Sequence, residues 1–312
     1  MSQILSLYDL KVENDTVCTI GNFDGIHIGH QKILNILREE SQRSSISSVV
    51  VTFYPHPRKV LFPQNFKCSI VNLETKVYLL KQFSVDYILT VDFNEKFYSK
   101  TAKEFMDFLK ERLRCRVLIV GKDWKFGQNK EGDVEFAKEY GEQIGIEVKG
   151  IEDVVLEDER ISSTKIRGLL AEGKVREVRE LLGRNYFLRE RVVRGNQIGR
   201  SIGFPTINLK PGEDLCLKKG VYAGFIQIDG KVYSAVINYG YRPTVDGKSL
   251  FMEAHVIESF KQELSQGSFV NVYFCEFIRE ELKFESVEKL KEQIEMDVVK
   301  SREVLFYADY PV

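Results

Sequence analysis

Four short apolar runs in the first half of the chain place the strongest constraint on its fold. They occupy residues 16–20, 49–53, 87–91 and 117–120, and they are rich in β-branched residues and free of charge. Runs of this kind are typical of strands that are buried on both faces of a parallel sheet. Stretches with the helical spacing of apolar residues separate them. The alternation predicts a doubly wound, Rossmann-like α/β domain.

The pattern changes after about residue 184. Strand-like runs then follow one another without intervening helices, at residues 186–194, 221–228, 232–238, 251–258 and 269–277. Asp229 and Gly230 join two of these runs and form a strong two-residue hairpin signal. Consecutive strands with tight turns predict a small antiparallel β-barrel.

The chain closes with a helical pattern. Apolar residues recur on one helix face, at Val287, Leu290, Ile294 and Val298. We expect this C-terminal helix to pack against the barrel. Two domains are therefore predicted, at residues 1–184 and 185–312, with the boundary after the helical stretch 175–182.

The composition excludes several classes of protein. The 312 residues carry 45 Lys and Arg against 46 Asp and Glu, a net charge of −1. The chain thus lacks the overall basic field of a duplex-DNA binder, and no nucleic-acid partner is expected. No run approaches the length of a membrane-spanning helix and the N-terminus lacks a signal-peptide pattern, so no membrane partner is expected either.

The five cysteines are far apart and form no CxxC pair. This spacing argues against a disulfide framework and against a cysteine zinc site. Cys18, Cys115 and Cys275 lie in apolar strand-like runs, where a free cysteine behaves as a small buried hydrophobe. We therefore expect a protein of the reducing cytoplasm.

The segment IGNFDGIHIGH, residues 20–30, follows the first predicted strand and precedes a helix. Its glycines allow close approach of a ligand to the backbone, and the start of a helix is a ready anion site. His27 and His30 can donate hydrogen bonds to a triphosphate and to the charge that grows during transfer. The alternative is a pair of turn histidines that merely cap the helix. The residues expected to bind ATP phosphates here are Gly21, Asn22, Phe23, Asp24 and Gly29.

This segment is similar to the GxFDxxHxGH signature of the HxGH nucleotidyltransferases. Three further segments follow it in the chain: TFYPHP at 52–57, VGKDWKFG at 120–127 and ISSTKIR at 161–167. Together the four segments resemble the bacterial bifunctional riboflavin kinase/FAD synthetase family. The resemblance implies adenylyl transfer, in which the phosphate of FMN attacks the α-phosphorus of ATP and pyrophosphate leaves. Positioning and charge stabilisation would supply the catalysis, with Mg²⁺ neutralising the phosphates.

The three further segments add candidate ligands for both substrates. Ser163 and Thr164 would begin a helix as caps or phosphate donors, and Arg167 can hold a phosphate bidentately or remain a solvated charge. Asp123 would bind the adenosine or the flavin, unless it is a turn residue. The glycine-bearing stretch 126–133 predicts a mobile flap. The residues expected to bind flavin are Phe53, Pro55, His56, Pro57 and Phe126, although core packing would explain Phe53 equally well.

A second group of candidate site residues lies at residues 195–208, GNQIGRSIGFPTIN. Its glycines predict a pliable loop over phosphates, with Gly199 and Arg200 as ATP-binding residues. Thr206 and Asn208 share one face of an extended backbone, and their oxygens are suitable ligands for Mg²⁺. The alternative is a plain glycine-rich hairpin. The segment resembles the GRxxGFPTxN signature of riboflavin kinases.

One carboxylate in a later strand is the candidate general base of the kinase. In the run 251–258, Met252 and Ala254 share one face while Glu253 and His255 share the other. The resemblance places the base at Glu253, where it would take the proton from the riboflavin 5′-hydroxyl. By itself Glu253 could equally be an exposed strand carboxylate.

The resemblance implies a cytoplasmic enzyme, monomeric or weakly oligomeric, that uses ATP and Mg²⁺. Riboflavin and ATP would give FMN and ADP, and FMN and ATP would then give FAD and pyrophosphate. Three departures from the family pattern stand out: Trp124 and Lys165 replace Phe and Arg, and LSQG at 264–267 replaces Leu-Tyr-Gly. Lys165 keeps its charge but loses the bidentate fork of arginine. The loss of an aromatic residue at 264–267 puts riboflavin affinity in question.

Three alternatives remain open. The first is an FAD synthetase with a weakened kinase, and the second is a non-catalytic flavin sensor. The third takes HIGH at 27–30 as the motif of a class I aminoacyl-tRNA synthetase, although Ser163-Thr164-Lys165 is a poor match to the KMSKS loop of those enzymes.

Overall fold

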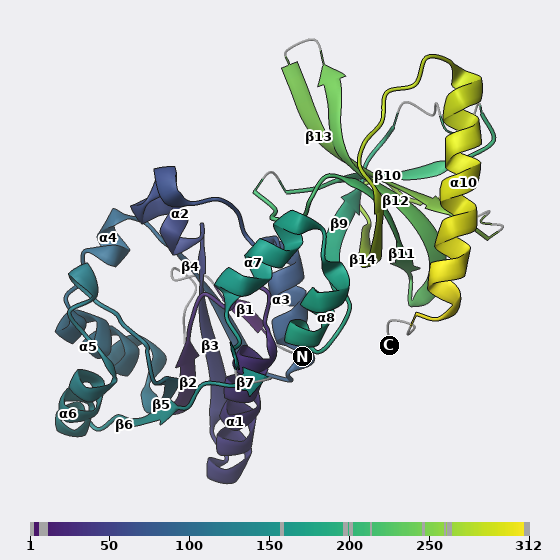
Figure 1. Cartoon of the computed structure of the whole chain (residues 1–312). Helices are drawn as coiled ribbons and strands as arrows, with labels where there is room; N and C mark the ends of the chain where they lie inside the picture. The colour runs from purple at the N-terminus through teal and green to yellow at the C-terminus, as the bar shows by residue number, and fades with distance from the viewer. Residues whose placement is uncertain are drawn as a thin grey trace. The chain divides into compact units, whose positions relative to one another are not determined.

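The computed structural model describes residues 3–5, 12–156, 159–195, 199, 202–212, 214–244, 247–258, 260 and 264–308. The chain divides into two compact units (Figure 1). The first, here called the sheet unit, comprises Met1–Lys67 and Lys76–Ser162. The second, the barrel unit, comprises Cys68–Thr75 and Ser163–Val312.

The sheet unit is built on six parallel strands in the order β1-β4-β3-β2-β5-β6. Their bounds are Gln3–Leu5 (β1), Thr16–Ile20 (β2), Ser47–Tyr54 (β3), Tyr87–Asp92 (β4), Cys115–Gly121 (β5) and Glu147–Ile151 (β6). From β2 the chain builds the sheet outward through β3 and β4, and then returns to β5 on the other side of β2. Such a topological switch point places a ligand site beyond the carboxyl ends of β2 and β5. The predicted doubly wound sheet is confirmed.

Helices cover both faces of this sheet. Figure 1 shows α5 (Ala102–Leu113) and α6 (Val134–Ile144) on one side, and α1 (Ile28–Ser44) and α3 (Leu73–Gln82) on the other. A capping box between Thr101 and Glu104 fixes the start of α5, since each side chain accepts from the backbone of the other. Three short pieces, α2 (Pro57–Leu61), α4 (Glu95–Tyr98) and η1 (Pro63–Asn65), lie between the longer elements, and β7 (Val155–Leu156) pairs with β8 (Glu159–Arg160).

The barrel unit is a closed antiparallel barrel in the order β10-β13-β12-β11-β14-β9. Its strands are Tyr186–Val192 (β9), Thr206–Lys210 (β10), Gly220–Ile228 (β11), Lys231–Thr244 (β12), Gly247–Val256 (β13) and Phe269–Arg279 (β14). Asp229 and Gly230 turn β11 into β12 with φ angles of 48° and 82°, as a type I′ hairpin requires. The predicted barrel is confirmed. The helices α7 (Ser163–Glu172) and α8 (Val175–Leu182) also belong to this unit.

The C-terminal helix α10 (Val287–Phe306) packs on β11, β12 and β14, as predicted. Its buried residues differ from the expected apolar face, because Val287 is 56% exposed whereas Asp297, Ser301 and Leu305 are buried. The buried Asp297 forms a two-pronged ion pair with Arg279 of β14, at 2.9 Å from Nε to Oδ1 and 2.6 Å from Nη2 to Oδ2. A charge pair thus fixes the helix where hydrophobic spacing alone had been expected to do so.

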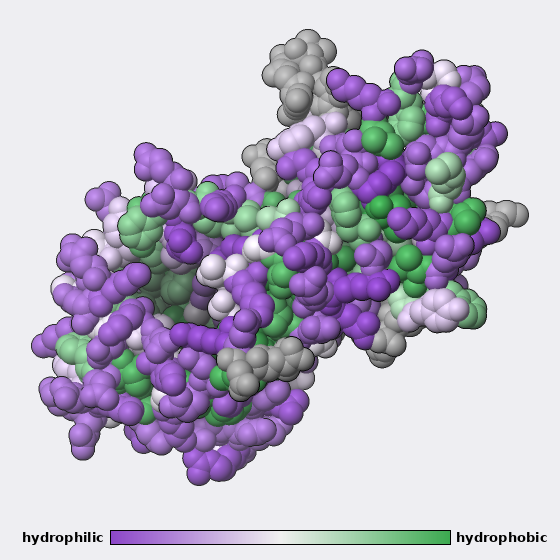
Figure 2. Space-filling model, viewed as in Figure 1, coloured by the Kyte–Doolittle hydropathy of each residue, from purple (hydrophilic) through white to green (hydrophobic). Residues whose placement is uncertain are grey.

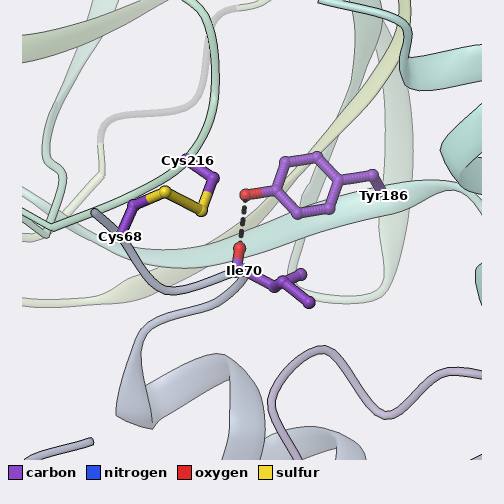
Figure 3. Close-up of a disulfide and its surroundings, with 4 residues drawn as sticks. All are labelled: Cys68, Ile70, Tyr186 and Cys216. Carbon is purple, nitrogen blue, oxygen red and sulfur yellow. Dashed lines mark hydrogen bonds between the residues drawn. A yellow bond between two sulfur atoms is a disulfide. The ribbon is translucent and has the colours of Figure 1, made fainter. Parts of the chain in front are cut away.

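The barrel unit recruits a segment from far upstream, residues 68–75. Cys68 forms a disulfide with Cys216, across a sequence separation of 148 residues (Figure 3). Close by, the hydroxyl of the buried Tyr186 donates a hydrogen bond of 2.7 Å to the carbonyl of Ile70 (Figure 3). The expectation that the cysteines form no disulfide is therefore wrong for this pair, since the fold brings together two residues that no local motif connects. Cys18, Cys115 and Cys275 are free and buried, as expected.

Hydrophilic side chains cover most of the face shown in Figure 2. Among the helices that the structure describes, none combines the length and the apolar character that crossing a membrane requires.

Candidate active sites

The loop that follows β2 lies at the switch point of the sheet and has an unusual backbone. Phe23 and Ile26 adopt positive φ angles of 48° and 43°, and Gly25 lies at 79°. Positive φ is costly for a non-glycine residue, by about 1–3 kcal/mol, and such strain is concentrated at functional sites. The side chains of Phe23 and Ile26 are fully buried, and this burial offsets the strain. The loop is therefore held in one shape, with α1 starting at its end.

The two histidines of this loop stack on each other at the start of α1. The ring centroids of His27 and His30 are 3.7 Å apart with an interplanar angle of 17°. His27 caps the helix, because its Nδ1 accepts a hydrogen bond of 3.4 Å from the backbone N–H of His30. An accepting Nδ1 carries no proton, so the neutral His27 ring presents its N–H at Nε2. A Cβ on Gly29 would lie 3.2 Å from the His27 ring, so glycine keeps this stack unobstructed.

Behind the loop, polar groups connect it to the end of β3. The buried hydroxyl of Thr52 donates to the carbonyl of Asn22 at 3.1 Å. Lys76 of α3 donates to the Thr52 hydroxyl at 3.4 Å and to the carbonyl of Phe53 at 3.1 Å. Asp24 is buried as well, with 2% of its surface exposed. Sequence reasoning missed Thr52 and Lys76, because a lysine in a short amphipathic helix resembles an ordinary surface charge.

The side-chain carbonyl of Asn22 is buried and has no hydrogen-bond partner among the described residues. A buried acceptor without a partner costs free energy, of the order of 1–3 kcal/mol. A bound ligand with a donor group would recover that cost. This oxygen therefore suits a hydroxyl or amino group of a ligand, while phosphate oxygens would need the backbone N–H groups of the loop.

An apolar cavity of about 660 Å³ opens beside this loop, below the carboxyl ends of the strands. Three of the predicted flavin-binding residues line it: Phe53, Pro57 and Phe126. Its remaining wall is largely aromatic, from Phe62, Phe93, Phe97, Tyr98, Phe105 and Trp124, with Lys100, Lys125 and Lys130 also present. The volume and the aromatic lining suit a flat, conjugated ring system that carries a negative group.

Trp124 and Phe126 form one side of this cavity as a stacked pair, with ring centroids 4.1 Å apart and an interplanar angle of 12°. The stretch that follows was expected to be a mobile flap, and the structure shows a tethered loop instead. Phe126 and Gly132 exchange two backbone hydrogen bonds of 3.0 and 2.9 Å, and Gln128 donates to the carbonyl of Lys100 at 2.7 Å.

The other two predicted flavin residues lie at the end of β3 and are absent from the lining of the cavity. The peptide bond between Tyr54 and Pro55 is cis. His56 caps α2, because its Nδ1 accepts from the backbone N–H of Arg58 at 3.1 Å, and its ring packs against Phe66. Both residues shape the turn from β3 into α2, and Pro57 of that turn reaches the cavity.

The candidate kinase site lies on two neighbouring strands of the barrel. Asn208 of β10 is the direct cross-strand partner of Glu253 of β13, and Thr206 is the partner of His255. The Thr206 hydroxyl donates to the Glu253 carboxylate at 3.4 Å. Met252 and Ala254 are fully buried, so Glu253 projects from the opposite face of the strand, as predicted. The fold thus brings together three of the predicted residues over a sequence separation of 47 residues.

Asn238 of β12 is the second cross-strand partner of Glu253, on the side of β13 away from β10. Asn208, Glu253 and Asn238 therefore form a row across three neighbouring strands. The side-chain oxygen of Asn238 is buried and lacks a hydrogen-bond partner among the described residues. The amide and carboxylate oxygens of the row, with the hydroxyl of Thr206, are the chemistry that Mg²⁺ prefers. The sequence alone assigned no role to Asn238, because only the register of β12 against β13 reveals one.

The glycines before β10 allow close approach, as expected. A Cβ on Gly195 would lie 2.2 Å from the side chain of Asn208, and one on Gly199 would lie 2.3 Å from the carbonyl oxygen of Phe204. Gly199 is therefore required by the backbone, whereas a side chain at position 195 would displace that of Asn208. Arg200, the other predicted phosphate ligand of this loop, lies outside the described residues.

Two known families match successive parts of the chain. The FAD synthetase family matches residues 9–165 and the riboflavin kinase family matches residues 182–305. A bifunctional riboflavin kinase/FMN adenylyltransferase from Haemophilus influenzae is 36% identical over 92% of this chain and 94% of its own length. One from Pseudomonas fluorescens is 36% identical over 97% of both chains.

The chain belongs to this family. It is therefore a transferase with a kinase part and a nucleotidyltransferase part, and the predicted family and enzyme class are confirmed. A crystal structure described as a macrolide-efflux protein from Streptococcus pneumoniae has the same fold, with a TM-score of 0.81 and 31% identity over 96% of this chain and 98% of that one.

The remaining family residues occupy distinct environments. Asp123, just after β5, is paired with Arg160, which also contacts Asp153 at 3.1 Å. Ser163 and Thr164 form the first turn of α7, as predicted, and Arg167 follows in its second turn; all three belong to the barrel unit. Their roles toward ATP stay predictions.

The departure from the family pattern at 264–267 forms a tight turn before β14. Gly267 has a φ of 88°, and its N–H donates to the carbonyl of Val192 at 2.9 Å. Ser268 closes the turn onto the carbonyl of Ser265 through its N–H and its hydroxyl. The turn is well formed without the aromatic residue that the family usually places there.

Proposed function

We propose that the chain converts riboflavin to FAD in two ATP-dependent steps, each at its own site. The observation that carries the proposal is the row Asn208–Glu253, with Thr206 beside it, in the same chain as the stacked His27–His30 pair. The Asn208–Glu253 row is suited to phosphorylation of a hydroxyl group, and the histidine pair is suited to adenylyl transfer. We assign adenylyl transfer to residues 1–184 and the kinase step to residues 185–312.

In the kinase step, Glu253 is the general base. Its carboxylate takes the proton from the riboflavin 5′-hydroxyl as that oxygen attacks the γ-phosphorus of ATP, and ADP leaves. Thr206 and Asn208 would hold Mg²⁺, which when bound neutralises the charge of the phosphates. Gly199 and Arg200 would bind the phosphates from the loop, where the glycine lets the backbone approach.

In the adenylyl transfer step, the phosphate of FMN attacks the α-phosphorus of ATP, the bond between the α-phosphorus and the bridging oxygen breaks, and pyrophosphate leaves. The backbone at Gly21–Asp24, the start of α1 and Gly29 receive the phosphates of ATP. His27, through Nε2, and His30 donate hydrogen bonds to the charge that develops on the transferred group. Neither histidine acts as a nucleophile.

The aromatic cavity holds the isoalloxazine ring of FMN. Phe53, Pro57 and Phe126 contact the ring directly, whereas Pro55 and His56 fix the turn that carries Pro57. Asp123, Ser163, Thr164 and Arg167 are proposed ligands of ATP. Both steps use Mg²⁺, and the enzyme works in the cytoplasm as a monomer or weak oligomer. A reducing cytoplasm would keep Cys68 and Cys216 as thiols, so the disulfide marks the oxidised form of the barrel unit.

A second candidate function is FAD synthesis with a weakened kinase. The observation that favours it is the turn at 264–267, which lacks an aromatic side chain. This candidate predicts a high KM for riboflavin with an unimpaired conversion of FMN.

A chromatographic time course of the purified chain with riboflavin, ATP and Mg²⁺ tests the proposal. We expect FMN to appear first and FAD to follow. Formation of FAD from supplied FMN, but of no product from riboflavin, would favour the second candidate. Formation of neither product, with flavin still bound, would favour a sensor and overturn the proposed function.

A further inference from the structure

A lysine is buried directly behind the phosphate loop, outside the set of residues that the sequence pointed to. Lys76 lies on α3 and only 5% of its surface is exposed. Lysine almost never occupies such a position unless its charge is used, because removing an ammonium group from water is costly. A buried charge beside a candidate site is a functional candidate in its own right.

The ammonium group of Lys76 contacts both sides of the site. It donates to the carbonyl of Phe53, whose ring lines the flavin cavity. It also donates to the hydroxyl of Thr52, which in turn donates a hydrogen bond to the carbonyl of Asn22 in the phosphate loop. A short chain of hydrogen bonds thus joins the backbone of the ATP subsite to the wall of the flavin subsite, with Lys76 as its only cation.

The charged state of this lysine is finely balanced. Burial lowers the pKa of Lys76 to about 8, and the carboxylate of Asp24 acts in the opposite direction. The end of β3 contributes a hydroxyl and a carbonyl oxygen, and the loop that carries Asp24 continues into His27 and His30. Lys76 therefore loses its proton within the pH range of an ordinary assay, well below the value near 10.4 of an exposed lysine.

We propose that Lys76 is a positioning residue for adenylyl transfer. Its ammonium group holds the phosphate loop and the wall of the flavin cavity in a fixed relative position. This inference rests on the proposed function of the sheet unit. The hydrogen bonds to Phe53 and Thr52 are charge-assisted only while Lys76 is protonated, and a neutral amine would hold both groups more weakly. Misplacement of reacting groups by about 1 Å costs on the order of 100-fold in rate.

Lys76 is distinguishable from a purely structural residue because its loss should affect kcat and the pH profile rather than folding. A buried cation opposes folding, so an apolar side chain of similar length should leave the sheet unit at least as stable. The predicted signature is a folded variant that binds FMN and ATP but turns them over slowly.

The test is the rate of FAD formation from FMN, ATP and Mg²⁺ between pH 6 and pH 10, measured on the full chain. For the wild type we expect kcat to fall as the pH rises through about 8. Lys76→Met should lower kcat at pH 7 by on the order of 10- to 100-fold, with little change in KM and without the alkaline fall. The arginine of Lys76→Arg keeps its charge at every pH tested. The fall of kcat at alkaline pH should therefore disappear in this variant, while kcat at pH 7 stays within severalfold of the wild type. Because His27 and His30 are unchanged in the variant, loss of the alkaline fall would assign that fall to Lys76. Lys81→Met, which removes an exposed lysine from the same helix, is the matched control.

Two controls keep the result interpretable. The riboflavin kinase rate of each variant reports on the barrel unit, and the fluorescence of Trp124, the single tryptophan, reports on folding of the sheet unit. A wild-type kcat and pH profile in Lys76→Met would overturn the inference, and so would an unchanged alkaline fall in Lys76→Arg. If the wild type itself forms no FAD from FMN, the proposed function fails instead.

Discussion

The two candidate sites of this chain fix their side chains by different means. In the sheet unit the backbone does so, through a loop with Phe23 and Ile26 at positive φ that places His27 at the N-cap of a helix. In the barrel unit the pairing of the strands fixes them, because Asn208 and Glu253 are direct cross-strand partners in a regular antiparallel ladder. One site is a strained loop on a parallel sheet, and the other is a row of side chains across strands.

The difference teaches where each site is vulnerable. The loop depends on what packs behind it, and in this chain that is a buried polar chain from Lys76 to Asn22. The strand site depends on register, since a slip of one residue would turn Glu253 to the buried face of β13. Substitutions of the proposed catalytic residues at one site should therefore leave the activity of the other site unchanged, and the first two predictions below test that separation.

The largest expected effect is on the kinase. Glu253→Ala removes the proposed base, so the rate of FMN formation from riboflavin should fall by about 10²–10⁴-fold. FAD formation from supplied FMN should stay within twofold of the wild type. Both rates are measured by chromatography, with Glu295→Ala, an exposed carboxylate on α10, as the control. Equal loss of both activities would contradict the separation of the sites.

The reverse experiment is His30→Ala. The substitution removes a donor to the developing charge and one ring of the histidine stack, so FAD formation should fall by about 100-fold or more. The kinase rate should not change. An adenylyl transfer rate close to that of the wild type would show that the His30 ring only packs against its neighbours.

A smaller effect is expected on the stability of the barrel unit. Glu190 of β9 is 3% exposed, and burial raises the pKa of its carboxyl to about 9 from 4.5. Between these values the folded chain binds a proton that the unfolded chain has released, so the free energy of unfolding falls with rising pH, by up to about 1.4 kcal/mol per pH unit. Glu190→Gln keeps a polar partner for Asn72 and removes this slope.

Denaturant unfolding between pH 5 and pH 9, followed by circular dichroism, measures the effect. The advantage of Glu190→Gln over the wild type should grow with pH. Trp124 fluorescence, which follows the sheet unit, should show the same transition in both proteins. A pH-independent difference between the two would show that Glu190 is ionised in the folded chain.

The smallest effect concerns the wall of the flavin cavity. Trp124→Phe keeps an aromatic ring against Phe126 but reduces its area, so the KM for FMN should rise by about two- to fivefold with kcat unchanged. The wild type should also show quenching of tryptophan fluorescence by FMN. Absence of both effects would place the flavin elsewhere in the sheet unit.

The sequence predicted the fold well wherever the burial of a strand is complete. The run at residues 16–20 matches β2 residue for residue, because all five side chains are buried and the pattern has no competing period. Strand β6 escaped notice, since this edge strand carries Glu147 and Lys149 and is only partly buried. The face of α10 was misjudged because the ion pair between Arg279 and Asp297 is a contact between separate elements.

For the sites, local motifs sufficed where one segment makes the whole site. The loop from Gly21 to His30 is one such segment, and its helix start was foreseeable. The pairing of Glu253 with both Asn208 and Asn238 depends on the register of three strands, which no single segment records. The same limit applies to Lys76, because its burial is a property of the packed sheet and not of the helix that carries it.

The recruitment of residues 68–75 by the barrel unit bears on how this chain can be cut. A gene fragment that begins near residue 163 encodes all six barrel strands but omits the segment that supplies the disulfide partner Cys68, the carbonyl acceptor for Tyr186 and the amide of Asn72 against Glu190. During synthesis on the ribosome this segment emerges long before the strands that it joins. The barrel unit is thus not contiguous in the sequence, and a fragment that begins near residue 163 would lack these three contacts unless residues 68–75 were supplied with it.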